Sequence, residues 1–177
     1  MIQEIVAAIA NELNGYFKLK FGVNENKLVL SNIIDQDGSV AIKSENKVIL
    51  SIVNITKDGT RGGGMGQNGH NQPTDICMYL LFTAYFNPEN YLEALKFLSG
   101  VVGFFQVKGM LNHRTLPQLP NHIDPIKVEI VKLSFDELSN MWSAIGAKYM
   151  PSVVYRIRSL SVQDSRIRNI DPVLKGY

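Results

Sequence analysis

Hydrophobic residues in the first part of the chain recur at every third or fourth position, which is the spacing of one face of a helix. The positions on this face are Ile2, Ile5, Val6, Ile9 and Leu13. Asn14 and Gly15 follow, and residues of these types are common where helices end. The pattern predicts an opening helix that ends near residue 14 and packs one face against a core.

Three runs of β-forming residues come next, at positions 28–34, 39–44 and 47–56, with Asp-Gly and Glu-Asn turn signals between them. Such runs joined by tight turns predict an antiparallel meander. In residues 48–55, hydrophobic side chains fall on both alternating faces, which is typical of a strand covered on two sides. We therefore expect a central strand in this region.

A polar stretch, residues 56–73, precedes the most hydrophobic part of the chain. It holds six of the fourteen glycines, among them Gly62, Gly63, Gly64 and Gly66. This composition cannot form a packed element, so we expect a flexible surface loop. Residues 76–86 are hydrophobic on both faces and predict the best-buried strand, with a helix as the second interpretation because of their Ala and Leu content.

Asn87 and Pro88 then supply an N-cap and a first-turn proline for a helix. Its inner stripe is predicted to consist of Tyr91, Leu95, Leu98, Val102 and Phe105. A second set of hydrophobic residues, Phe97, Val101 and Phe104, widens the apolar surface beyond what one sheet face needs. Part of this helix is therefore expected to meet a neighbouring chain.

The rest of the pattern predicts an irregular, Pro-rich segment at 108–125, a strand at 126–133, a helix and a last strand. Ser134 and Glu137 have the spacing of a capping box, and the helix they open carries Leu138, Met141, Trp142 and Ile145 on one side. Alternation from residue 152 places Arg156 and Arg158 on the wetter face of the last strand. These elements predict an α/β (α+β) fold, a single compact domain whose mixed, largely antiparallel sheet is flanked by about three helices.

Composition narrows the function classes. The 177 residues, 45% of them hydrophobic, are enough for one full core, while only 19% are charged, which favours a subunit of an assembly. A net charge of +2 is too small to attract nucleic acid over distance. The single cysteine excludes an internal disulfide and suits folding in the cytoplasm. We expect neither an export signal nor a membrane span, because no basic leader and no long apolar run occur.

No arrangement of residues indicates catalysis or a cofactor. The glycine run that begins at Arg61 lacks the Gly-Lys-Ser/Thr of a phosphate loop and does not open a helix. His70, His113 and His122 do not have the helical spacing of metal ligands. Cys77 lies in the most hydrophobic run, where a thiol is inert. We therefore expect no cofactor, no metal and no enzyme activity.

Positive charge is concentrated near the C-terminus. Residues 151–177 contain five cations, Arg156, Arg158, Arg166, Arg168 and Lys175, against two carboxylates, Asp164 and Asp171. One interpretation is a solvated face; the other is an arm that docks on an acidic partner.

Four stretches carry a resemblance to a known family. They are the N-terminal helix, VILSIVNIT, YLLFTAYF with the helix YLEALKFLSGVVGFFQ, and LSFDELSNMWSAIGAKYMPSVVYRIRSLSV. Together they resemble the N-terminal domain of the cap, or tail terminator, proteins of contractile phage-tail-like injection systems, of the antifeeding prophage and Photorhabdus virulence cassette type. We assign residues 1–163 to a tail-terminator-like domain, of which the resemblance covers residues 2–163. Residues 164–177 are then a basic C-terminal tail.

This resemblance implies a phage tail-terminator-like domain that forms a hexameric ring on the distal end of a tube and sheath, stops their polymerisation and anchors the last sheath layer. The particle is then assembled in the cytoplasm and either released or kept in the cell. We expect the strand at 152–162 to offer a free edge, and Arg156, Arg158, Arg166 and Arg168 to contact sheath or an adjacent subunit. The alternatives are a monomeric adaptor and a small enzyme that uses the glycine-rich loop and His70.

Overall fold

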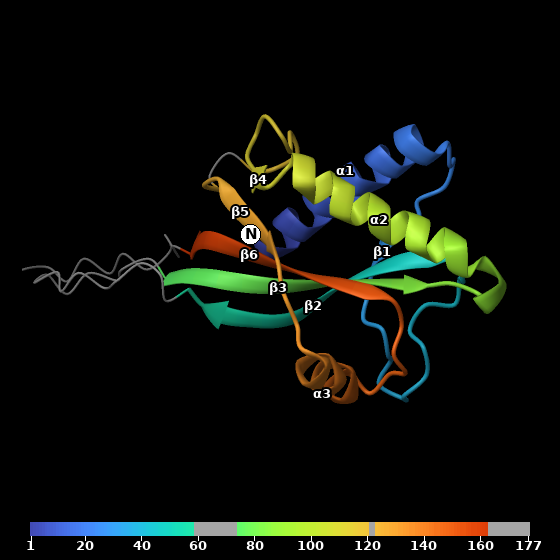
Figure 1. Cartoon of the computed structure of the whole chain (residues 1–177). Coiled ribbons are helices and arrows are strands. Elements are labelled where there is room, and N and C mark those ends of the chain that lie inside the picture. The colour runs from blue at the N-terminus through green and yellow to red at the C-terminus, as the bar shows by residue number, and fades with distance from the viewer. Residues whose placement is uncertain (59–73, 121–122, 163–177) are drawn as a thin grey trace, which may run out of the picture.

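The computed structural model describes residues 1–58, 74–120 and 123–162 (Figure 1). The helices are α1 (Ile2–Phe21), η1 (Pro88–Asn90, a 3-10 turn), α2 (Tyr91–Val107) and α3 (Phe135–Ile145). The strands are β1 (Leu28–Leu30), β2 (Lys47–Lys57), β3 (Thr74–Tyr85), β4 (Met110–Leu111), β5 (Ile126–Ile130) and β6 (Ser152–Val162). The α+β fold class predicted from the sequence is confirmed.

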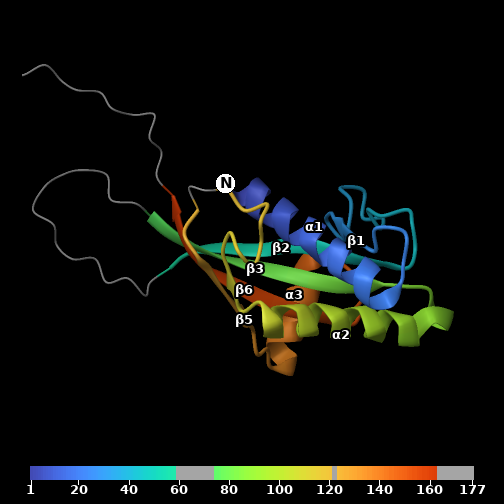
Figure 2. The same ribbon diagram turned by 90° about the horizontal axis from the view of Figure 1, so that it is seen from above.

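All six strands form one sheet in the order β1-β2-β3-β6-β5-β4. Only the β1–β2 pair is parallel among the described strands. α1 and α2 lie next to each other over one face of the sheet, and α3 lies on the opposite face (Figures 1 and 2). The molecule therefore has three layers and two separate hydrophobic clusters, one on each side of the sheet.

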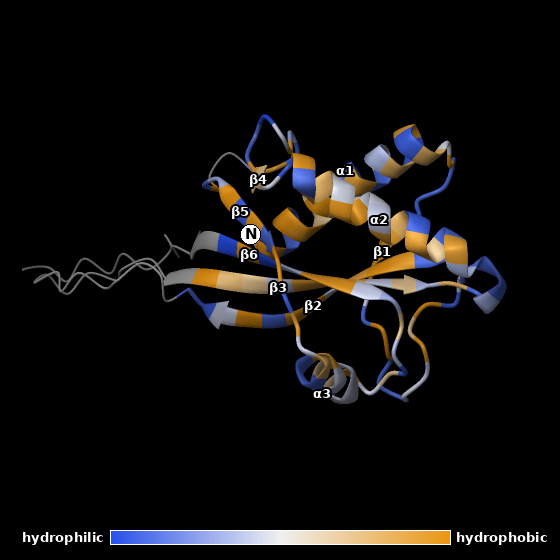
Figure 3. Cartoon of the chain, in the orientation of Figure 1, coloured by the Kyte–Doolittle hydropathy of each residue, from blue (hydrophilic) through white to orange (hydrophobic). Residues whose placement is uncertain are grey.

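The larger cluster lies between the sheet and the helices α1 and α2. β3 contributes Met78, Leu80 and Phe82 to it, while Leu81 points to the other cluster. Figure 3 shows that β3 is hydrophobic over much of its length. The prediction of a best-buried strand at residues 76–86 is confirmed, and the helical interpretation is wrong.

Helix α1 continues seven residues beyond the end predicted from Asn14 and Gly15, to Phe21. Asn14 does not turn the chain, because its buried side chain binds the backbone of Leu28 instead. The actual end is Gly22, whose φ of 66° is the left-handed conformation that glycine adopts without strain.

The predicted antiparallel meander is wrong in two respects. β1 pairs with β2 in the parallel sense, and residues 39–44 form no strand apart from one isolated bridge between Ile34 and Val40. β2 is covered on both faces only as far as Leu50, since Ile52 and Ile55 are exposed. Turn signals alone therefore identified the breaks between these segments but not their pairing.

The inner face predicted for α2 is also wrong, except at Phe105. Tyr91 is 53% and Leu95 37% exposed, whereas Phe97, Val101 and Phe104 are buried in the core. The cause is the extension of α1, which places the rings of Phe17 and Phe21 against Phe97. The set that was expected to meet a neighbour thus packs inside the domain, whereas Tyr91 and Leu95 are exposed and Leu98 and Val102 are only half-buried.

The starts of two helices are confirmed as predicted. Asn87 accepts a hydrogen bond from the Glu89 N–H (3.1 Å) at the start of η1, which leads into α2. Ser134 and Glu137 form a complete capping box at the start of α3. The cap sets the rotation of α3 so that Trp142 points inward, where it is 4% exposed.

The last strand is not an edge. β6 lies between β3 and β5 and pairs with both, so the free edge predicted at residues 152–162 is wrong where β5 pairs with it, from Tyr155 to Arg158. Beyond Arg158 the described pairing of β6 is with β3 alone. Another open edge occurs on β2, where no described strand pairs on the β1 side after Leu50.

Candidate partner-binding face

Arg156 and Arg158 of β6 lie on the face of the sheet that α3 partly covers. The neighbouring residues Tyr155 and Ile157 belong to the hydrophobic cluster on the α1 and α2 side of the sheet. Because side chains alternate along a strand, both arginines point to the α3 side. Both bind one carboxylate on β5: Glu129 Oε2 accepts hydrogen bonds from Arg156 Nη2 (2.9 Å) and Arg158 Nη1 (3.3 Å). Glu129 Oε1 is 2.7 Å from Lys127 Nζ.

These cations control the protonation of Glu129. Hydrogen bonds from Lys127 and then Arg156 lower the pKa of Glu129 from 4.5 to about 2, so the group is ionised at neutral pH. The same contact with Glu129, followed by one with Tyr79, raises the pKa of Arg156. Glu129 and Arg156 are therefore both charged at neutral pH.

A second carboxylate connects the cluster to β2. Asp58 Oδ1 lies 3.6 Å from Arg158 Nη2, and the Asp58 side chain is buried. The five groups Lys127, Glu129, Arg156, Arg158 and Asp58, which we call the Glu129 cluster, have one positive charge in excess. Arg156 is the arginine of this cluster with more exposure, at 36% of its side chain.

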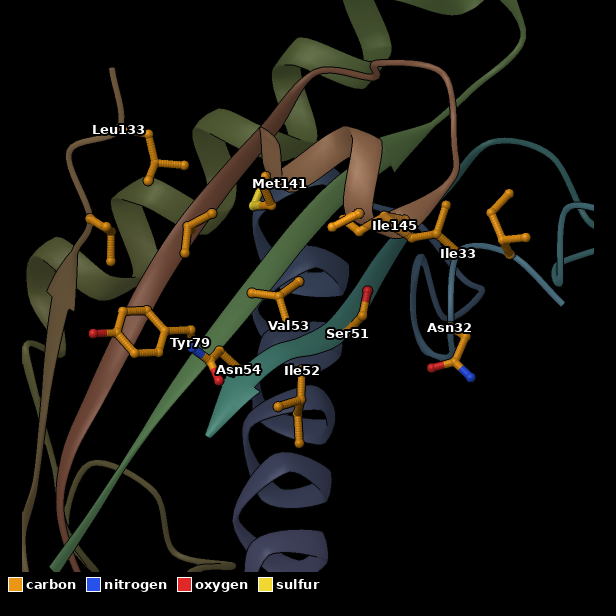
Figure 4. A pocket seen from close by; sticks show the side chains of 14 residues that line it. Asn32, Ile33, Ser51, Ile52, Val53, Asn54, Tyr79, Leu133, Met141 and Ile145 are labelled. Carbon is orange, nitrogen blue, oxygen red and sulfur yellow. The ribbon is translucent and has the colours of Figure 1, made fainter. Parts of the chain in front are cut away.

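Beside the Glu129 cluster, a groove of about 500 Å³ opens between α3 and the sheet (Figure 4). Met141 and Ile145 of α3 form one wall, and Ser51 and Val53 of β2 belong to the floor. Residues 32–34 close one end. Most of the accessible lining is apolar, and the volume is in the range of clefts that take a small ligand or a few side chains.

Strand register connects the groove to the arginines. Tyr79, which lines the groove, pairs with Asn54 on one side and with Arg156 on the other. Arg156 in turn pairs with Glu129. Asn54 and Tyr79 of this row line the groove, and the charged pair Arg156 and Glu129 continues the row beyond them; we call the row the lip of the groove.

The other residues predicted to bind a partner, Arg166 and Arg168, lie outside the described residues. So do Gly62, Gly63, Gly64 and Gly66 of the predicted flexible loop, together with His70 and His122. His113 lies exposed in a turn. Among the described residues, no three His, Cys, Asp or Glu side chains gather in a group suited to a metal ion.

Cys77 is buried, and burial raises the pKa of its thiol. A protonated thiol in a packed strand is a poor nucleophile, so the assignment of Cys77 to the core is confirmed.

The sequence analysis missed Glu129 and the groove. Lys127 and Glu129 alternate with hydrophobic residues in the predicted strand, and this could have shown that they share a face. Nothing in the sequence showed that this strand lies next to Arg156 and Arg158. The groove depends on the three-dimensional position of α3, which leaves part of the sheet uncovered.

Comparison with known families identifies the domain. The family model of the Pvc16 N-terminal domain matches residues 4–175. The chain belongs to the Pvc16 N-terminal domain family. The resemblance to tail terminators seen in the sequence is therefore confirmed, and the match includes Arg166 and Arg168.

Two solved structures share the fold of this Pvc16 N-terminal domain. One is the PVC sheath/tube terminator of an extracellular contractile injection system in its extended state, with a TM-score of 0.60 and 18% identity over 93% of this chain and 57% of that one. The other is the anti-feeding prophage cap, a tube-terminating cap, with a TM-score of 0.50 and 16% identity over 88% of this chain and 55% of that one. The chain thus spans about half the length of these proteins.

No match was found among curated proteins. In the described part of the chain, no helix is long and apolar enough to span a bilayer.

Proposed function

We propose that this domain is a structural cap that sits on the distal end of the tube and sheath of a contractile injection particle. There it ends polymerisation of both layers and anchors the last sheath layer. The observation that carries the proposal is the family match over residues 4–175, supported by a fold similar to that of the PVC sheath/tube terminator. The role is mechanical and requires no catalytic group.

A cap on a six-fold tube requires a ring of identical subunits, and we propose a homohexamer. The outer stripe of α2 supports contact between subunits, because Tyr91 and Leu95 are exposed, Leu98 and Val102 are half-buried, and burial of such a stripe is favourable. Native mass spectrometry of the full chain measures the copy number. A Leu95→Lys variant should shift the population from hexamer to monomer.

The contact with the sheath is proposed at the Glu129 cluster, with Arg156 and Arg158 joined by Arg166 and Arg168. Contacts through exposed charges govern the rate and salt dependence of association more than the stability of the subunit. Reversal of charge at Arg166 and Arg168 should therefore weaken capping in a salt-dependent way and leave the thermal midpoint of the isolated chain unchanged.

The capping function is tested by the lengths of sheaths in cells that produce all particle components except this chain. The proposal predicts a broad length distribution without the chain and a narrow one after its return. Equal distributions in the two cases would refute a terminator role. We also propose that the particle is assembled in the cytoplasm. Detection of assembled particles inside cells before lysis tests this location.

A further inference from the structure

The groove beside the Glu129 cluster exposes hydrophobic surface that the domain itself does not cover. α3 buries Trp142 against Leu81 and Val154, but it leaves Met141 and Ile145 only partly buried. On the floor of the groove, Val53 of β2 is also only partly buried. A concave apolar surface of this kind gains free energy when a partner removes it from water.

One side of the groove has a distinct charge. The row Asn54, Tyr79, Arg156 and Glu129 forms the lip opposite α3, and Lys127 and Arg158 flank Glu129 on the same face. Three cations share two carboxylates in the Glu129 cluster, so the lip carries an excess positive charge. An acidic group is therefore the complementary partner at this lip, whereas a basic group would be repelled.

Arg156 has unused capacity to bind such a group. Its Nη2 donates to Glu129, and its Nε is buried within the domain, so an outside group can reach only the remaining N–H donors. A guanidinium offers five N–H donors, and one carboxylate does not use all of them. With 36% of its side chain exposed, Arg156 can donate a hydrogen bond to a second carboxylate from outside the domain.

We infer that this groove binds a polypeptide segment of another particle subunit, in which a few hydrophobic side chains are followed by a carboxylate. The hydrophobic side chains contact Met141, Ile145 and Val53, and the carboxylate binds Arg156. The inference rests on the proposed function only in assigning this segment to the sheath side of the cap. The groove volume of about 500 Å³ limits the contact to a few side chains, so a single such contact is weak and gains strength from repetition around a ring.

The test uses the full chain and short fluorescein-labelled peptides. The peptides share leucine and isoleucine residues and differ at one following position, which is Glu, Gln or Lys. Fluorescence anisotropy should show the Glu peptide binding about tenfold more tightly than the Gln peptide, the free-energy scale of one charge-assisted contact, and the Lys peptide binding most weakly. Equal binding of the three peptides, or no binding of any, would overturn the inference.

Two variants and a control assign the effect to the groove. Arg156→Gln should abolish the preference for Glu over Gln, because Glu129 keeps Lys127 and Arg158 as partners and the fold persists. Val53→Lys, which places a charge on the floor of the groove, should weaken binding of all three peptides. The control is Leu19→Lys, at an exposed position of α1 on the other side of the sheet. It should change neither the preference for Glu over Gln nor the affinity for any of the peptides. Thermal midpoints equal to that of the parent establish that the variants fold.

The outcome separates this inference from the capping function. If the peptides do not bind and the chain still restores uniform sheaths, the groove inference is wrong and the cap function stands. If the peptides bind with the predicted preference but sheath lengths do not depend on the chain, the cap function is wrong. If Val53→Lys dissociates the assembled chain and the peptides do not bind, the groove is a contact between copies, which also refutes the inference.

Discussion

Arg156 and Glu129 face each other across β6 and β5, and their side chains are joined by a hydrogen bond of 2.9 Å. The pair holds an arginine that the sequence suggested was free for a partner. The arginine nevertheless stays partly exposed, because the sheet face beyond α3 is open. The pair therefore stabilises the pairing of the two strands and presents a charged group beside the groove.

Glu129 makes the stability of the domain depend on acid pH. Its folded pKa of about 2 lies below the ordinary value of 4.5, so its contribution is complete above pH 4.5 and is lost as pH falls toward 2. Chemical denaturation at a series of pH values should show a smaller loss over this interval for Glu129→Gln than for the parent. An identical pH dependence of the two proteins would show that the carboxylate is not bound by its neighbours.

Trp142 anchors α3 to the sheet, and its ring lies 5.7 Å from that of Tyr149. Replacement by Ala should lower the free energy of unfolding by about 3 to 5 kcal/mol, because a buried ring is lost and a cavity remains. Phe135 on the same helix is 90% exposed, so Phe135→Ala is the matched control and should have little effect. Similar losses in the two variants would contradict the orientation of α3.

Asn14 fastens α1 to β1 with two hydrogen bonds of 2.9 Å to the backbone of Leu28. Asn14→Ala leaves a buried N–H and a buried carbonyl without partners, which should cost about 1 to 3 kcal/mol for each group. Asn11→Ala on the same helix removes an exposed bond to Gln118 and should cost far less. Urea denaturation of both variants measures the difference, and equal midpoints would argue against the buried contact.

Gly100 of α2 lies directly against the aromatic rings of Phe17 and Phe21 of α1. A Cβ at this position would lie 2.8 Å from Cε2 of Phe21 and 3.0 Å from Cε1 of Phe17. Gly100→Ala should therefore destabilise the domain by about 1 to 3 kcal/mol despite the better helix propensity of Ala. Gly15→Ala meets no atom within 4 Å and should stabilise it slightly. A stabilising effect at both positions would refute the close packing.

The sequence predicted where helices and strands begin better than it predicted which of them lie next to each other. Asn87, Ser134 and Glu137 identified helix starts, because capping depends on atoms within one turn. The face of α2 was misassigned because its hydrophobic residues occupy two stripes, and only the rings of Phe17 and Phe21 decide which one is buried. The edge position of β6 was misassigned for a similar reason, since strand order is a long-range property.

The candidate site shows the same difference between local features, which the sequence predicted, and long-range contacts, which it did not. Arg156 and Arg158 were identified from local charge and alternation, without their partner Glu129 on a strand 27 positions away in sequence. Which of these side chains share a face follows from alternation, and which of them touch follows from topology.

The central claim, that the chain caps the distal end of a contractile particle, is tested most directly by cryo-electron microscopy of intact particles that contain it. The account predicts density for a ring of this domain on the last layer of tube and sheath, at the end away from the baseplate. Density for the domain at the baseplate, or complete sheath ends that lack it, would contradict the account.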